Sequence, residues 1–89
     1  MGKRGKLEII RDILQIVRDN RNQIKFTPLL RKSNISSSRF KEYFSELTEK
    51  KLIQEEILKN DKYIKLTDKG FKFLEKYHTI LEFIEQFDL

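Results

Sequence analysis

The sequence predicts a mostly helical α+β fold, with three helices, a two-stranded β-hairpin and a long C-terminal helix in that order. Apolar residues recur at spacings of three and four before residue 20 and again after residue 70, which is the period of one helical face. Between these segments, residues 36–70 hold a Ser-led amphipathic segment, two short segments rich in strand-forming residues, and the run Leu66-Thr67-Asp68-Lys69-Gly70. This central run predicts a helix followed directly by a hairpin.

The first helix is expected over about residues 5–19, with one apolar face made by Leu7, Ile10, Ile13, Leu14 and Val17. Residues 20–23 break this period, and residues 24–26 form a short extended segment that could pair with the hairpin as a third strand. Thr27 then has the chemistry of a helix N-cap and Pro28 that of a first helical residue, which predicts a short second helix ending near Lys32.

A turn is expected at residues 33–35, because Asn34 tolerates a left-handed backbone. The third helix should start at Ser36, whose hydroxyl can accept a hydrogen bond from an amide of the first turn. Its buried stripe is expected to be Phe40, Tyr43, Phe44 and Leu47. The hairpin strands should follow at residues 52–58 and 62–66, joined by residues 59–61, and Thr67 should cap a last helix that ends near Phe87.

A helix followed at once by a short hairpin is the arrangement of a winged helix-turn-helix. The helix can enter the DNA major groove while the hairpin, or wing, lies on the flanking backbone or in the minor groove. Charge supports this interpretation: residues 1–53 carry thirteen Lys/Arg against six Asp/Glu, residues 54–66 carry three against three, and residues 67–89 carry three against five. We therefore expect the basic first part of the chain to bind duplex DNA.

Composition excludes several other classes of function. The 89 residues form one domain, and the chain has no Cys, which rules out a disulfide framework, a zinc ribbon and a thiol nucleophile. A lone His78 cannot form a metal site, and there is no Gly-rich phosphate loop, so we expect neither an enzyme nor a cofactor. No apolar stretch is long enough to span a bilayer or to form a signal peptide, so a cytoplasmic, nucleoid-associated protein is expected.

The candidate base contacts lie on the exposed positions at the start and middle of the third helix. Arg39 is the strongest of them, because its guanidinium can bond guanine O6 and N7 together. Glu42 either accepts a bond from cytosine N4 or pairs with Arg39 three residues before it. Short Ser side chains favour phosphate, although N-capping alone could explain a Ser run. The full set is Ser37, Ser38, Arg39, Glu42 and Ser45.

The candidate backbone contacts are basic side chains around the second and third helices and at the wing. They are Lys25, Arg31, Lys32, Lys41, Lys59 and Lys62, and each phosphate that they neutralise would steepen the salt dependence of binding. Lysines at a hairpin tip can equally serve solubility. Lys3, Arg4 and Lys6 form either a basic arm that contacts DNA or an unstructured solvated end.

The last helix carries more apolar surface than one small domain can cover. Phe73, Tyr77, Ile80, Ile84 and Phe87 follow at spacings of 4, 3, 4 and 3, which is the pattern of a coiled-coil seam. We expect Leu74 to pack on the first helix and the distal seam to pair with the same helix of a second subunit. The alternative is that the helix folds wholly onto its own domain. A membrane-surface role is disfavoured because Glu75, Glu82, Glu85 and Asp88 would be repelled by anionic lipid.

The chain resembles the small archaeal winged-helix DNA-binding proteins over nearly its whole length. The resemblance rests on residues 5–14 (GKLEIIRDIL), 44–53 (FSELTEKKLI) and 61–70 (DKYIKLTDKG). It implies a winged helix-turn-helix over residues 1–66 and a dimerisation helix over residues 67–89, within one compact unit. In this family the C-terminal helices pair as an antiparallel coiled coil, which implies a homodimeric transcription regulator or chromatin-type protein that binds double-stranded DNA without a cofactor or small-molecule ligand.

The chain departs from this family at one position. A Gly is common after the third helix, where it serves as a left-handed C-cap, and here the residue is Lys51. Gly70 does fit the pattern and is expected to allow close packing.

The main alternative function is a winged helix that acts as a protein–protein interaction module in a larger assembly. Such a module would have no need to keep its third helix and surroundings basic, so the charge distribution favours DNA.

Overall fold

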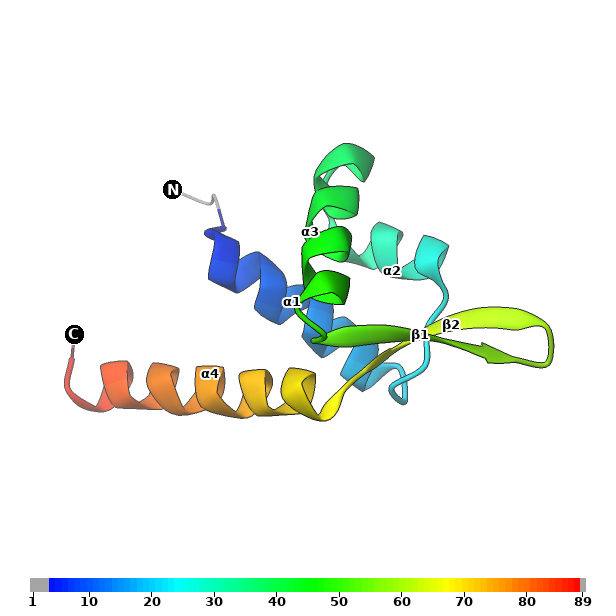
Figure 1. Cartoon of the computed structure of the whole chain (residues 1–89). Helices are drawn as coiled ribbons and strands as arrows, with labels where there is room; N and C mark the ends of the chain where they lie inside the picture. Colours follow the sequence, from blue (N-terminus) through cyan, green and yellow to red (C-terminus); the bar gives the residue numbers. More distant parts are fainter. Residues whose placement is uncertain (1–3, 89) are drawn as a thin grey trace.

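The computed structural model describes residues 4–88 and contains the expected order of elements (Figure 1). Three helices, α1 (Lys6–Asp19), α2 (Phe26–Ser33) and α3 (Ser37–Glu49), come first. The hairpin strands β1 (Ile53–Leu58) and β2 (Asp61–Leu66) and the long helix α4 (Asp68–Gln86) follow. The predicted fold class, a helical domain with a hairpin wing and a long C-terminal helix, is thereby confirmed.

The molecule is elongated, with principal extents of 49 × 27 × 21 Å. Figure 1 shows why: the hairpin projects from one end of the helical body and α4 extends past it at the other. Helix α1 is central, because it packs against α2, α4 and β2. The N-terminal end of α3 points away from α4, so α4 does not cover this end of the helix (Figure 1).

The core is built around α1, whose buried face differs from the predicted stripe at one position. Ile10, Ile13, Leu14 and Val17 are buried as expected, but Leu7 is 59% exposed and Ile9 is buried in its place. Leu7 lies in the first turn, where no neighbouring element covers it. The rest of the core comes from every other element: Ile24, Leu29, Phe40, Leu47, Leu52, Ile53, Ile64, Leu66 and Leu74.

Two of the predicted helix caps are confirmed by hydrogen bonds. The Ser36 hydroxyl accepts a bond from the Arg39 amide at 3.3 Å, and the Thr67 hydroxyl accepts one from the Gly70 amide at 3.1 Å. Asn34 ends α2 with φ 57° and ψ 38°, the left-handed conformation predicted for it. These caps fix where α3 and α4 begin.

The predicted start of the second helix is wrong. Helix α2 begins at Phe26 with Lys25 as its N-cap, so Thr27 is inside the helix and Pro28 is its third residue. The cause is aromatic packing, because the Phe26 ring meets Phe40 at 5.2 Å and Phe44 at 5.1 Å, both edge to face. A proline at the third position is tolerated, since its amide would have no partner within the helix.

The hairpin is tighter than predicted. Leu58 pairs directly with Asp61, so the turn contains only Lys59 and Asn60, and Asp61 belongs to β2. Both turn residues have positive φ, 51° and 68°, as in the type I′ turns that suit two-residue hairpins. The third strand shrinks to one residue: Ile24 makes two backbone hydrogen bonds with Ile64, at 3.1 and 2.7 Å, and Phe26 is helical instead.

Lys51 takes the left-handed conformation that a glycine would normally supply, with φ 61°. The Leu52 amide bonds the Leu47 carbonyl at 2.9 Å and the Lys51 amide bonds the Thr48 carbonyl at 3.1 Å. These two bonds form a complete Schellman motif at the end of α3. The lysine therefore keeps the usual route from helix to wing, at a backbone cost of about 1 kcal/mol.

Helix α4 packs on its own domain only along its first half. Leu74 is buried, as predicted, and the Arg11 guanidinium lies 5.1 Å from the Tyr77 ring centre. Phe73 and Tyr77, the first two predicted seam residues, are therefore half-buried within the chain. From His78 to Asp88 every residue is exposed, so the alternative that α4 folds wholly onto its own domain is wrong.

Candidate nucleic-acid interface

The predicted base-contact residues all lie on the solvent side of α3. Phe40 and Leu47 face the core and Tyr43 and Phe44 are half-buried, so the remaining positions of the helix are turned outward. The structure brings Ser37, Ser38, Arg39, Glu42 and Ser45 onto this exposed surface. Because α4 lies away from the N-terminal end of α3, a long ligand can approach this end without a clash from α4 (Figure 1).

The serines at the start of α3 divide into one N-cap, Ser36, and two exposed residues that follow it, Ser37 and Ser38. Ser36 holds the Arg39 amide, and its oxygen lies 3.5 Å from that of Ser38. Ser37 and Ser38 are exposed in the first turn, where the helix dipole and unpaired amides favour an anion. N-capping therefore accounts for Ser36 but for neither of the next two serines.

Arg39 is not paired with Glu42. Within residues 4–88, no carboxylate oxygen lies within 4.0 Å of the Arg39 guanidinium. Both side chains border a shallow hollow on the exposed side of α3, together with Lys6, Tyr43 and Glu46. The guanidinium is thus available to an external acceptor.

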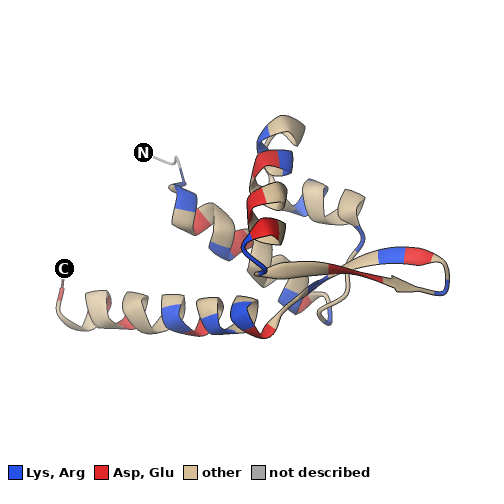
Figure 2. Cartoon of the chain, viewed as in Figure 1, with Lys and Arg blue, Asp and Glu red and all other residues tan. Residues whose placement is uncertain are grey.

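Helix α3 itself is not basic, contrary to the sequence-based argument. It carries two basic residues, Arg39 and Lys41, against three acidic ones, Glu42, Glu46 and Glu49 (Figure 2). One of these acids is neutralised, because Glu46 lies 2.8 Å from the Lys50 ammonium and 3.0 Å from that of Lys6. Hydrogen bonds from Lys50 and Lys6 lower the pKa of Glu46, and the bond to Glu46 raises the pKa of Lys50. The positive charge near α3 therefore comes mainly from the residues around it.

The predicted backbone contacts separate into free and paired cations. Arg31 and Lys32 on α2, Lys41 on α3 and Lys59 at the hairpin tip are exposed, and no carboxylate among residues 4–88 lies within 4.0 Å of them. Lys25 lies 3.5 Å from Asp61 and Lys62 lies 3.9 Å from Glu55. Exposed pairs of this kind are weak, so they reduce rather than abolish a cation's attraction for phosphate.

The predicted N-terminal arm is packed against the domain at the two residues that the structure describes, Arg4 and Lys6. The Arg4 guanidinium bonds Asp12 at 2.7 Å and the carbonyls of Ser33 and Asn34 at 2.9 and 3.2 Å. It therefore holds the C-terminal end of α2 against α1. Lys6 is the first residue of α1 and lies 3.0 Å from Glu46, so neither Arg4 nor Lys6 is part of a disordered arm or an unstructured end, while Lys3 lies outside the described residues.

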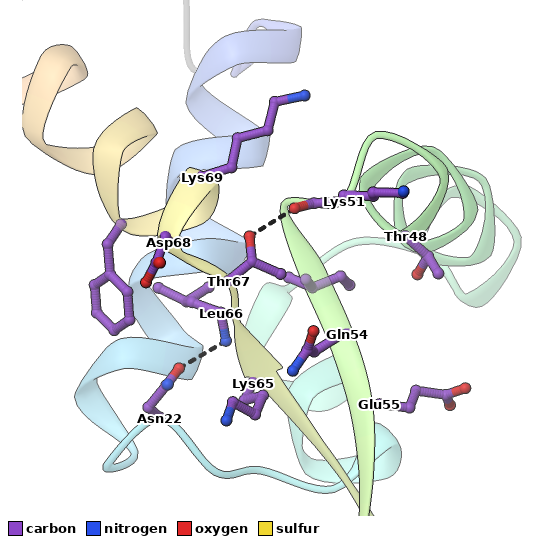
Figure 3. A pocket seen from close by; sticks show the side chains of 12 residues that line it. Asn22, Thr48, Lys51, Gln54, Glu55, Lys65, Leu66, Thr67, Asp68 and Lys69 are labelled. Atoms are coloured by element: carbon purple, nitrogen blue, oxygen red, sulfur yellow. Dashed lines mark hydrogen bonds between the residues drawn. The ribbon is translucent and has the colours of Figure 1, made fainter.

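Sequence reasoning missed a group of lysines at the base of the hairpin (Figure 3). Lys51 and Lys69 border an open hollow between the end of α3, the strands and the start of α4. The Lys69 ammonium donates to the Lys50 carbonyl at 2.8 Å, and the Thr67 hydroxyl donates to the Lys51 carbonyl at 2.6 Å. The sequence does show two adjacent lysines at residues 50–51. Lys69 lies 19 residues further along the chain than Lys50, and only the folded structure brings the two together.

The described residues contain neither a candidate metal site nor a candidate membrane-spanning helix. No three His, Cys, Asp or Glu side chains between residues 4 and 88 are grouped so that they could hold a metal ion. No helix in the same range combines the length and apolar character needed to cross a membrane.

A sequence model of the winged helix-turn-helix family matches residues 3–85. The chain belongs to the winged helix-turn-helix family. In winged-helix terms, α2 and α3 form the helix-turn-helix and the β1–β2 hairpin is the wing. No curated protein matches the chain in sequence.

Two solved structures share this fold. Sso10a-2, a DNA-binding protein from Sulfolobus solfataricus, superposes with a TM-score of 0.73 at 20% identity, over 94% of this chain and 85% of that one. F93 from STIV, a winged-helix DNA-binding protein, gives a TM-score of 0.73 at 22% identity, over 90% of this chain and 92% of that one. At such identities the likeness shows the fold alone, over most of the chain.

Proposed function

We propose that this winged-helix protein binds duplex DNA as a homodimer and acts as a transcription regulator or a chromatin-type protein. The N-terminal half of α3 enters the major groove, and the wing lies along the flanking duplex. The observation that carries the proposal is the exposed guanidinium of Arg39 near the N-terminal end of α3, with no carboxylate of residues 4–88 within 4.0 Å. Such a side chain can bond O6 and N7 of one guanine, which contributes about 1–3 kcal/mol of discrimination.

The charge around α3 supports contact with phosphate. Arg31, Lys32 and Lys41 are exposed on α2 and α3, on either side of the helix-turn-helix turn. The hydroxyls of Ser37 and Ser38 add donors at the positive end of the α3 dipole. Glu46 would repel phosphate if it were free, but its two ammonium partners remove most of that repulsion.

The distal half of α4 supports the dimer. Its exposed apolar side chains are Ile80, Leu81, Phe83, Ile84 and Phe87, with Phe83 and Phe87 in ring contact at 4.7 Å. A projecting helix with this much apolar surface is unfavourable in water unless a partner covers it. A second copy supplies an identical stripe, and antiparallel pairing would place the two recognition helices far apart along the duplex.

The two similar structures are both described as DNA-binding proteins. At 20% and 22% identity the likeness does not say which side chains of this chain would meet DNA, so Arg39 must be tested in this chain. The exposed stripe of α4 also fits a second candidate, a winged helix that docks onto another protein of a larger assembly. That candidate needs no affinity for duplex DNA.

Fluorescence anisotropy with a random-sequence duplex over a series of salt concentrations tests the proposal. We expect log affinity to fall steeply and linearly with log salt, and Arg39→Ala to weaken binding and lower the slope by about one. Arg18→Ala is the matched control, because Arg18 is exposed but borders the hollow between α1 and α4. Undetectable binding at low salt would contradict DNA binding and favour the protein-docking alternative.

A further inference from the structure

The tip of the wing exposes apolar side chains instead of a cluster of free cations. Ile57 is 71% exposed and the adjacent Leu58 is 37% exposed. Because successive residues of a strand point to opposite faces, the narrow end of the hairpin carries one apolar side chain on each face. Ile57 is paired across the ladder with Lys62, and Leu58 with Asp61.

The charges of the wing are largely matched within the chain. Lys62 lies 3.9 Å from Glu55 and Lys65 lies 3.1 Å from Glu56, both across the two strands. Asp61 lies 3.5 Å from Lys25. Lys59, in the turn itself, is the wing cation without a carboxylate within 4.0 Å among residues 4–88. A wing that followed phosphates along the backbone would need more free cations than this.

The tip is held on a rigid support. The two-residue turn fixes Lys59 and Asn60 at positive φ, and at the other end of the hairpin Ile53 and Leu66 are buried in the core. The backbone bonds between Ile24 and Ile64 tie the hairpin to the segment before α2. Ile57 and Leu58 are therefore presented in a set position, and little conformational entropy is lost when they bind.

We propose that the wing tip enters the DNA minor groove as an apolar wedge, with Ile57 and Leu58 against the groove walls or a base step and Lys59 on a flanking phosphate. This inference rests on the proposed DNA binding and specifies how the wing takes part in it. Apolar side chains inserted from the minor groove partly unstack base pairs and bend the duplex. The wedge should therefore bend DNA and favour minor grooves that are free of the guanine amino group.

A protein partner fits the wing tip less well. Specific protein interfaces bury several hundred Å² on each side around an apolar centre. Here two apolar side chains stand on opposite faces of a narrow ribbon, so no flat surface could cover both. A groove only about 6 Å wide with two walls does match that shape.

The test compares wild type, Ile57→Thr and Lys59→Ala on a duplex carrying a fluorescent donor and acceptor at its ends. Leu7→Thr is the matched control. Leu7 is also an exposed apolar residue, but it lies on α1 and outside the wing. Each variant is bound to the same duplex with guanine and with inosine, which lacks the minor-groove amino group but keeps O6 and N7. Thermal melts confirm that all four proteins are folded.

We expect wild type and Leu7→Thr to bend the duplex and to bind the inosine form about threefold tighter or more. Ile57→Thr should lose the bend and the inosine preference with an unchanged salt slope, whereas Lys59→Ala should lower the slope by about one and keep the bend. Salt-dependent binding by Ile57→Thr with the wild-type bend and inosine preference would overturn the wedge and leave DNA binding intact. Absence of binding by every protein would overturn both.

Discussion

The carbonyl oxygen of Leu52 occupies the space in which a Cβ on Gly70 would stand. The same oxygen accepts a hydrogen bond from the Thr67 amide at 3.2 Å, so the start of α4 is held directly against the base of the wing. Gly70 is in the first turn of α4 and is buried. The contact links the orientation of the long helix to that of the wing.

We predict that Gly70→Ala destabilises the protein by about 1–3 kcal/mol, the usual cost of overpacking. The backbone oxygen of Leu52 cannot rotate away as a side chain would, so α4 must shift. Urea unfolding followed by circular dichroism measures the change. Gly5→Ala is the control: its Cβ would meet only Glu8 Oε1 at 3.7 Å, and its effect should stay within about 1 kcal/mol. Equal stability of Gly70→Ala and wild type would show that the contact relaxes without cost.

We predict that Lys51→Gly stabilises the protein, in contrast to Gly70→Ala. A glycine adopts the left-handed conformation of residue 51 without steric strain, so we expect stabilisation by about 1 kcal/mol. Lys50→Gly is the matched variant, because Lys50 has φ −81° and bonds Glu46, and it should destabilise the protein. Thermal melts of both variants show whether each substitution raises or lowers the stability. A destabilised Lys51→Gly would mean that the lysine side chain contributes more than its backbone strain costs.

Acid stability should depend on Glu46. Its pKa is lowered by hydrogen bonds from Lys50 and Lys6, so its stabilising contribution is present above the ordinary value of 4.5 and is lost as the pH falls through the lowered pKa. Glu46→Gln should therefore lose less stability than wild type from about pH 6 to about pH 3. Parallel curves for Glu46→Gln and wild type would contradict the assigned role of the two ion pairs.

The proposed dimer predicts that Ile84→Lys is monomeric. Ile84 is exposed on distal α4, so the substitution places a charge in the paired stripe without disturbing the core of one chain. Sedimentation equilibrium should show half the wild-type mass. Glu85→Lys, one residue along on the same exposed segment, should remain dimeric, and a wild-type protein that sediments as a monomer would exclude the dimer. Loss of the dimer should also weaken DNA binding, because two linked sites bind by avidity.

Local chemistry predicted much of this fold from sequence. The caps at Ser36 and Thr67 and the left-handed Asn34 depend on neighbours within a few residues, and all three are as expected. The Phe73 to Phe87 pattern identified the apolar stripe of α4, although it did not show that the first two members are partly covered by α1.

The errors arose where distant residues decide the local structure. The early start of α2 follows from the contacts of Phe26 with Phe40 and Phe44. Arg4 is fixed by a carbonyl 29 residues away, and Lys69 by one 19 residues away. Within the candidate site, sequence placed the exposed α3 positions correctly, but which cations are free was decided by cross-strand and inter-helix ion pairs.

In the proposed complex, the N-terminal end of α3 and the wing face duplex DNA. The most direct measurement is an NMR titration of ¹⁵N-labelled protein with a short duplex, which reports each backbone amide separately. We expect the largest shifts on residues 36–42 and 57–60, with the distal half of α4 unchanged. Shifts confined to α4, or no shifts at low salt, would contradict the account.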